Sequence, residues 1–212
     1  AVSPGWVASA EPEGLIHLTR QTRLKPALTS LERADPVTLE LFNKRFMGVA
    51  EAMGAALERT AHSVNIKERL DFSCALFDAE GGLVANAPHM PVHLGSMGAS
   101  VRAVRDRHAH LRPGDAFALN NPYAGGTHLP DITVVMPVFL DPADGRPRFY
   151  VAARGHHADV GGIQPGSMPP FSHTLADEGV LLDALPIMRD GVFLEDAVRA
   201  AFGAGPLPAR NI

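Results

Sequence analysis

Two apolar segments separated by a short polar turn set the strongest constraint on the fold of this chain. Residues 131–139 (DITVVMPVF) are rich in β-branched side chains, which favour a buried strand. The segment DPADG at 141–145 consists mainly of turn-forming residues, and residues 148–153 supply a returning strand. The sequence therefore predicts a β-hairpin whose two outer ends lie at the same edge of a sheet.

Two helices are predicted in the part of the chain before this hairpin. The first begins at Asp35-Pro36, because Asp35 can cap the first turn and proline needs no donor there, and it runs to about Arg59. Its core-facing side is defined by apolar residues at steps of three and four: Leu39, Phe42, Phe46, Val49, Met53 and Leu57. The second helix is expected to begin with Ser96 as its cap.

The remaining regular segments predict strands. Residues 71–77 and 83–85 form a second hairpin around the turn at 78–82, and residues 116–119 form a further strand. Helices and strands are mixed without regular alternation. We therefore expect an α+β fold with a mixed, largely antiparallel sheet, flanking helices and Gly/Pro-rich site loops.

Glycine and proline are more frequent than in an average protein, with 20 and 18 residues. They fall between the periodic segments, so we interpret them as loop residues of an ordered domain. The first 34 residues show weaker patterns. They predict one short strand at Gly14–Leu18 and a polar, basic connector from Thr19 to Ala34.

Charge and cysteine content exclude several classes of protein. The formal net charge of −4 argues against a nucleic-acid binder, which normally carries a clustered basic excess. No apolar run approaches the length of a membrane-spanning helix. A single cysteine, Cys74, precludes an internal disulfide and fits a reducing compartment such as the cytoplasm. The first residues lack both a signal-peptide pattern and an initiator Met, so we expect a fragment or a processed product.

Ligand-type residues gather in two loops at the ends of the 131–153 hairpin. The first loop contains His128 and Asp131, and the second contains His156, His157 and Asp159. Two histidines with one or two carboxylates form a ligand set suited to Zn²⁺, Mn²⁺ or Fe²⁺. The alternative is that these are hydrogen-bonded loop histidines and turn-capping carboxylates. His157 is expected either to support the ligands from outside or to be a packing residue, because neighbouring side chains on an extended segment point in opposite directions.

Other polar residues have less specific patterns. His89 and His93 either line the same cleft or cap loops, and Pro91 between them argues against their sharing a helix. Glu178 either supplies a carboxylate for acid–base chemistry or lies in a solvated turn. Cys74, within a predicted strand, is expected to be an inert buried thiol. Phosphate-cradling and dinucleotide motifs are absent from the sequence, so no ATP site is expected in this chain.

Several long motifs, in order, resemble the hydantoinase B/oxoprolinase family. They are ERLDFSCALFDAEGGLVANAPHMPVHLGSM, NNPYAGGTHLPDITVV, GHHADVGGIQPGSMPP and DEGV, and the resemblance extends from about Asp35 to about Ile187. The opening PGWVASAEPEGLIHL is similar to the end of the partner hydantoinase A part. The resemblance thus implies a fused, 5-oxoprolinase type of chain. Residues 1–34 would be the tail of the A-like part and a connector, and residues 35–212 the N-terminal portion of a truncated B domain.

This resemblance implies an ATP-dependent hydrolase of cyclic amides. In such enzymes the A part binds ATP and Mg²⁺ and phosphorylates the lactam or hydantoin oxygen, and the B part completes ring opening. For 5-oxoproline the product would be glutamate, and an N-methylhydantoinase type is the related case. The implied partners are a hydantoinase A-like ATP-binding part and a small cyclic amide, in an oligomeric parent enzyme.

The resemblance also implies site residues. The related acetone carboxylase large subunit holds a divalent metal through a His-x-x-Asp motif and a later His, and the matching positions here are His128, Asp131 and His156. Asn121 stands where the family commonly has Asp, which bears on full activity. Four further positions are expected to supply catalytic groups that orient ligands or move protons: Asp159, Glu178, His89 and His93.

Two other functions stay open from the sequence. The first keeps the metal and changes the chemistry to ATP-dependent ketone carboxylation, which requires an additional small subunit. The second is a docking module that binds no metal. Catalysis by these 212 residues alone is not expected, because nothing in them resembles an ATP site.

Overall fold

The computed structural model describes residues 2, 5–12, 14–20, 35–141, 143, 145–166 and 168–210. The chain divides into two compact units, residues 1–40 and residues 41–212. Most of the predicted connector, residues 21–34, lies outside the described residues. Among the described residues, no helix combines the length and the apolar character that crossing a bilayer requires.

The first unit contains an antiparallel hairpin of β1 (Trp6–Ala10) and β2 (Ile16–Arg20). The strand predicted at Gly14–Leu18 therefore begins later and includes Thr19 and Arg20, which we had assigned to the connector. The reason is pairing: Trp6 lies opposite Arg20, and the guanidinium of Arg20 lies 5.4 Å from the centre of the indole ring.

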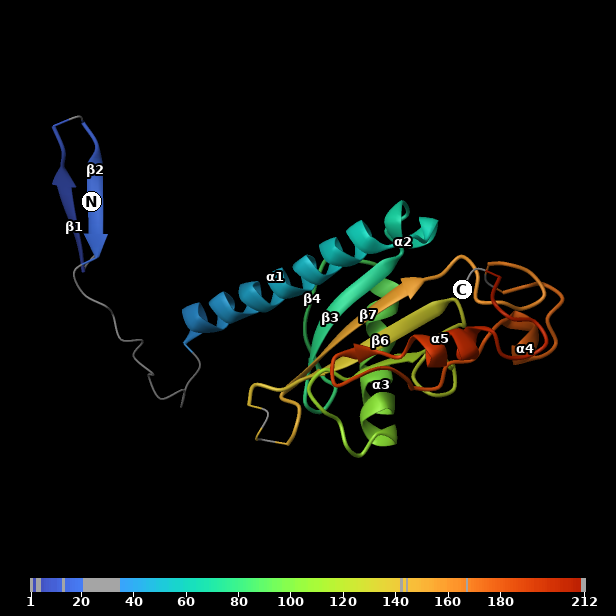
Figure 1. Cartoon of the computed structure of the whole chain (residues 1–212). Helices are drawn as coiled ribbons and strands as arrows, with labels where there is room; N and C mark the ends of the chain where they lie inside the picture. Colours follow the sequence, from blue (N-terminus) through green and yellow to red (C-terminus); the bar gives the residue numbers. More distant parts are fainter. Residues whose placement is uncertain are drawn as a thin grey trace. The chain divides into compact units, whose positions relative to one another are not determined.

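A seven-stranded sheet forms the second unit (Figure 1). Its strands follow the order β4 (Leu83–Asn86), β3 (Phe72–Asp78), β7 (Phe149–His156), β6 (Asp131–Val138), β5 (Ala116–Leu119), β8 (Leu185–Arg189) and β9 (Val192–Phe193). Neighbouring strands pair antiparallel throughout. This arrangement confirms the predicted α+β fold.

The hairpin predicted at 131–153 is β6 and β7, and β7 continues to His156. This strand is longer than predicted because it pairs along its whole length with β6 on one side and with β3 on the other. His156 therefore lies at the end of a central strand, where a rigid backbone fixes its position, and not in a loop.

Helices cover both faces of the sheet (Figure 1). Phe72 and Cys74 of β3 pack against Ile66 of α2 (Val64–Lys67), and α1 (Pro36–Thr60) covers the same face. Phe77 of β3 points the other way and packs against Met97 of α3 (Pro91–Arg107). Two shorter helices follow, α4 (Leu175–Glu178) and α5 (Glu195–Phe202).

The first helix begins where the sequence predicts. One carboxylate oxygen of Asp35 accepts hydrogen bonds from the backbone N–H and the hydroxyl of Thr38, both at 3.0 Å. The predicted apolar side is only partly covered, however, because Leu39, Phe42 and Val49 are exposed. Its fully buried residues are Ala50 and Gly54, whose small size lets the helix approach the sheet closely.

The second helix begins earlier than predicted, at Pro91 and not after Ser96. Proline occupies the first turn, where its missing N–H costs no hydrogen bond, so Pro91 starts the helix in a segment where the sequence predicts a loop. His93 consequently lies in the first turn of α3, whereas His89 lies before the helix. Ser96 is not a cap, since its hydroxyl bonds within the helix and to Arg154.

We predict that the thiol of Cys74 is unreactive in the folded protein. It is fully buried, and burial raises the pKa of its thiol to about 11. Ellman's reagent at pH 8 should give no colour with the native chain and one equivalent in denaturant. An Ala56→Cys variant, with its added thiol on the exposed side of α1, should react at once and serves as the control. Rapid labelling of Cys74 in the native chain would contradict its buried position.

Candidate metal centre

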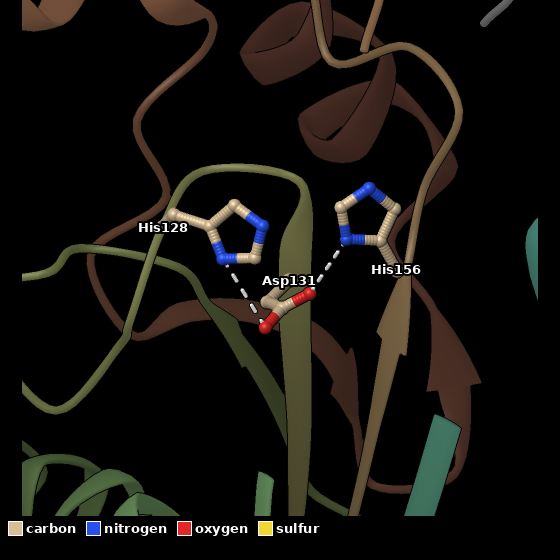
Figure 2. A group of neighbouring side chains, drawn as sticks. All are labelled: His128, Asp131 and His156. Carbon is tan, nitrogen blue, oxygen red and sulfur yellow. Dashed lines mark hydrogen bonds and ion pairs between the residues drawn. The ribbon is translucent and has the colours of Figure 1, made fainter. Parts of the chain in front are cut away.

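Asp131 lies at the centre of a group of histidines at one end of the sheet (Figure 2). Its Oδ1 is 3.0 Å from Nδ1 of His156, and its Oδ2 is 3.2 Å from Nδ1 of His128. The side chain of Asp131 is only 5% exposed. One ligand atom from each of the three residues lies within 4.8 Å of the other two. The structure thus brings together the three residues predicted as metal ligands.

Strand register and one tight turn create this group. Asp131 and His156 are directly paired across β6 and β7, so their side chains project from the same face. His128 precedes Asp131 by a turn in which the Asp131 N–H donates to the His128 carbonyl at 3.0 Å. The hydroxyl of Thr127 donates to Asp131 Oδ2, also at 3.0 Å. The turn therefore returns the His128 ring to the carboxylate.

The glycine-rich loop before His128 is fixed by close packing. A Cβ on Gly126 would lie 2.4 Å from the carbonyl oxygen of Asn120, so only glycine fits there. The buried Asn120 amide donates to the carbonyls of Leu129 and Val180 at 2.8 and 2.9 Å and accepts from the Leu182 N–H at 2.7 Å. Both ends of the loop are thereby held against the sheet.

The three residues form a charged and directional site. Burial alone would raise the pKa of Asp131, but hydrogen bonds from His128 and His156 outweigh it and hold that pKa well below its usual range. The same hydrogen bond raises the pKa of His156. An ionised carboxylate flanked by two imidazole nitrogens is a donor set that fits a borderline divalent cation, which would replace the shared protons.

A second carboxylate, Asp71, was missed by the sequence analysis. His93 Nε2 is 3.5 Å from Asp71 Oδ1 and 3.6 Å from Asp131 Oδ2, so His93 joins the two acids. Burial lowers the pKa of His93 despite these neighbours. Asp71 directly precedes β3, and the start of β3 lies beside the end of β7, where His156 stands. The sequence predicts Asp71 as the first residue of a strand, but the pairing of β3 with β7 could not be predicted from it.

A fully buried arginine lies beneath the group. Arg154, two residues before His156 on β7, donates from Nε to the Thr133 hydroxyl at 2.7 Å. Its terminal nitrogens donate to the hydroxyls of Ser100, at 2.8 Å, and Ser96, and to the carbonyls of His93 and Gly125, both at 3.4 Å. Burial lowers the pKa of Arg154, and the charge of Asp131 opposes this effect.

His89 lies apart from the group around Asp131. Its Nδ1 accepts a hydrogen bond from the Cys74 N–H at 3.1 Å, and its ring packs on Phe72 at 4.8 Å between centroids. His93 instead contacts the Ser73 hydroxyl, and Phe72 and Ser73 point to opposite faces of β3. The two histidines predicted to share a cleft are thus on opposite sides of one strand.

Asp159 and Glu178 also have partners elsewhere. Asp159 Oδ1 accepts from Arg210 at 2.7 Å and from the Gly161 N–H at 2.9 Å. Glu178 accepts from the Ser172 hydroxyl at 3.1 Å. The structure does not bring either carboxylate into the group around Asp131.

A cavity of about 710 Å³ lies on the opposite face of β6 and β7. Its wall includes Asp159 and three sequence neighbours of the candidate ligands, Ile132, Gly155 and His157. The polar group and the cavity therefore use alternate residues of the same two strands. His157 faces this cavity, consistent with the expected opposite direction of its side chain.

Asn121 has a structural role in the described chain. Its Oδ1 accepts from the Tyr123 N–H at 3.0 Å, and its side chain also hydrogen-bonds Asp183, which pairs with Arg107. An aspartate at position 121 would bring a second carboxylate against Asp183.

We predict that Arg154→Met destabilises the chain strongly. The change leaves three hydroxyls and two carbonyls without their donor, at a cost of about 3–5 kcal/mol in the free energy of unfolding. Arg154→Lys should lower the free energy of unfolding by less, because lysine keeps the charge. It should still lower it, because lysine lacks the forked geometry of the guanidinium. Urea unfolding followed by circular dichroism measures both, with Arg146→Met on the exposed loop as the control. Equal midpoints for Arg154→Met and the control would show that the network adds no stability.

Sequence comparison shows which known proteins this chain is similar to. The hydantoinase B/oxoprolinase family matches residues 35–212. 5-oxoprolinase 1 of Arabidopsis thaliana is 51% identical over 197 residues, which cover 89% of this chain and 15% of the relative. The chain therefore spans a small part of the length of the curated relative that it matches.

Two solved structures share the fold. A nucleotide-free acetone carboxylase, described as ATP-dependent, superposes with a TM-score of 0.70 at 18% identity, over 80% of this chain and 22% of the other. An ATP-dependent caprolactamase from Pseudomonas jessenii gives a TM-score of 0.67 at 26% identity, over 79% of this chain and 29% of the other. With a family match over most of its length and this shared fold, the chain belongs to the hydantoinase B/oxoprolinase family.

Proposed function

We propose that this chain is the metal-bearing part of an ATP-dependent hydrolase of cyclic amides, of the 5-oxoprolinase or hydantoinase type. One observation supports it most: a buried carboxylate stands between two histidines at the edge of a central hairpin. The names of the similar proteins, a 5-oxoprolinase and a caprolactamase, describe enzymes of cyclic amides.

His128, Asp131 and His156 would hold the ion. Asp131 supplies the negative charge, and the two imidazoles supply neutral nitrogen donors whose directions are fixed by a turn and by strand pairing. A bound Mn²⁺, Zn²⁺ or Fe²⁺ would act as a Lewis acid, polarising an oxygen atom or lowering the pKa of a water. Because His128 is 29% exposed and His156 is 14% exposed, a small molecule can approach from their side.

Of the four predicted acid–base residues, His93 is the one that the geometry favours. It contacts the Asp131 carboxylate, whereas His89 bonds the backbone of β3, Asp159 bonds Arg210 and Glu178 bonds Ser172.

The ATP-dependent step belongs, in this proposal, to a hydantoinase A-like part that binds ATP and Mg²⁺. Support comes from the length of the relative, of which this chain covers 15%, and from the ATP-dependent neighbours. The assembled enzyme would be an oligomer acting on a small lactam or hydantoin, and the reduced, buried Cys74 suits a location in the cytoplasm.

Metal content tests the site. The purified chain, dialysed against Mn²⁺, Zn²⁺ or Fe²⁺ and then against buffer, should retain about one equivalent by plasma mass spectrometry. Asp131→Asn, which keeps the shape and removes the charge, should lose most of it. Asp183→Asn, a carboxylate paired with Arg107 outside the group, is the matched control and should retain the metal. A folded chain that retains none of the three ions would contradict the proposal.

Product analysis distinguishes the two enzymatic candidates, since the fold is shared with a ketone carboxylase. With 5-oxoproline and ATP, the full-length gene product should form glutamate and ADP. ATP-dependent incorporation of labelled bicarbonate into acetone, without glutamate formation, would favour the carboxylase instead. If the protein catalyses neither reaction and binds no metal, the result would favour a docking module.

A further inference from the structure

His93 stands between two carboxylates that come from different strands. Its Nε2 lies 3.5 Å from Asp71 Oδ1, ahead of β3, and 3.6 Å from Asp131 Oδ2 at the start of β6. The residue is only 3% exposed, so the ring is shielded from bulk water. Without this ring, no group would stand between the two acidic side chains.

The other side of the ring is anchored. Nδ1 of His93 lies 3.2 Å from the Ser73 hydroxyl, and this hydroxyl in turn lies 2.9 Å from the Met90 carbonyl, which also accepts the His93 N–H at 3.2 Å. Ser73 is fully buried. Both ring nitrogens therefore have fixed neighbours, and rotation of the ring would remove the polar partner of at least one nitrogen.

Asp71 is held in place by its backbone. Its N–H donates to the Asn65 carbonyl at 2.9 Å, its carbonyl accepts from the His156 N–H at 3.0 Å, and the Phe72 N–H bonds back to Leu70 at 2.9 Å. Leu70 adopts a φ of +54°, a left-handed conformation that is costly for a residue with a side chain. The chain thus maintains a strained bend that delivers the Asp71 carboxylate to His93.

We infer that His93 is a positioning residue: anchored by Ser73, it holds the carboxylates of Asp71 and Asp131 in place on either side of its Nε2 atom. This inference rests on the proposed function, because Asp131 belongs to the candidate metal centre. Residues that orient metal ligands from behind change metal affinity by about 10- to 100-fold when they are replaced.

Co²⁺ binding to the folded chain tests the inference, with visible absorption as a report on ligand arrangement. His93→Phe, which keeps an aromatic ring at this position but has neither nitrogen, should weaken Co²⁺ binding by about 10- to 100-fold and shift the absorption bands. His93→Gln, whose amide can still bond a carboxylate, should recover part of the affinity. Ser73→Ala releases the anchor and should change the spectrum in the same direction as His93→Phe.

His89→Phe is the matched control, because this histidine lies on the other side of β3 and should leave the Co²⁺ spectrum as in the parent chain. Thermal unfolding of every variant separates loss of fold from loss of orientation, and Ser73→Ala decides the question where His93→Phe does not fold. Parent-like affinity and spectrum in a folded His93→Phe or Ser73→Ala chain would overturn the positioning role and leave the proposed metal centre standing. A folded parent chain that binds no Co²⁺ would remove both.

Discussion

A guanidinium shielded from water needs oxygen atoms on all of its N–H groups, and Arg154 meets this need by gathering three segments of the chain. Its nitrogens reach Thr133 on β6, Ser96 and Ser100 on α3, and the Gly125 carbonyl in the glycine-rich loop. β6 also carries Asp131, α3 carries His93, and the glycine-rich loop leads directly into His128. The relative positions of the histidines and Asp131 therefore depend on one buried cation.

A neighbouring carboxylate offsets part of the cost of burying this cation. All five oxygen atoms that bind Arg154 are neutral, and Asp131 is the buried charge that opposes the effect of burial on its pKa. Opposite charges close together in a poorly solvated region lower each other's cost. Arg154 and Asp131 thus form a charge pair without a direct hydrogen bond, and the oxygens of Asp131 stay available to His128 and His156.

Local sequence patterns predicted the hairpin of β6 and β7 because its strands are close in the chain and its turn has a characteristic composition. This hairpin alone is sufficient to place Asp131 beside His156, so the candidate ligands were accessible to sequence reasoning. Asp71 was not accessible, since its place follows from the pairing of β3 with β7, two strands distant in sequence. The start of α3 was misplaced for a different reason, because Pro91 can begin a helix as well as interrupt one.

The order of strands in the sheet has a consequence for how the centre assembles. Closing the hairpin of β6 and β7 joins strands separated only by residues 139–148, whereas β3 ends at Asp78 and must find β7, which begins at Phe149. Short loops close at a smaller entropic cost than long ones. Folding that follows this rule forms the group of His128, Asp131 and His156 within a local hairpin, and Asp71 joins when β3 docks. An ion captured at the hairpin stage would then act as a template for the rest of the sheet.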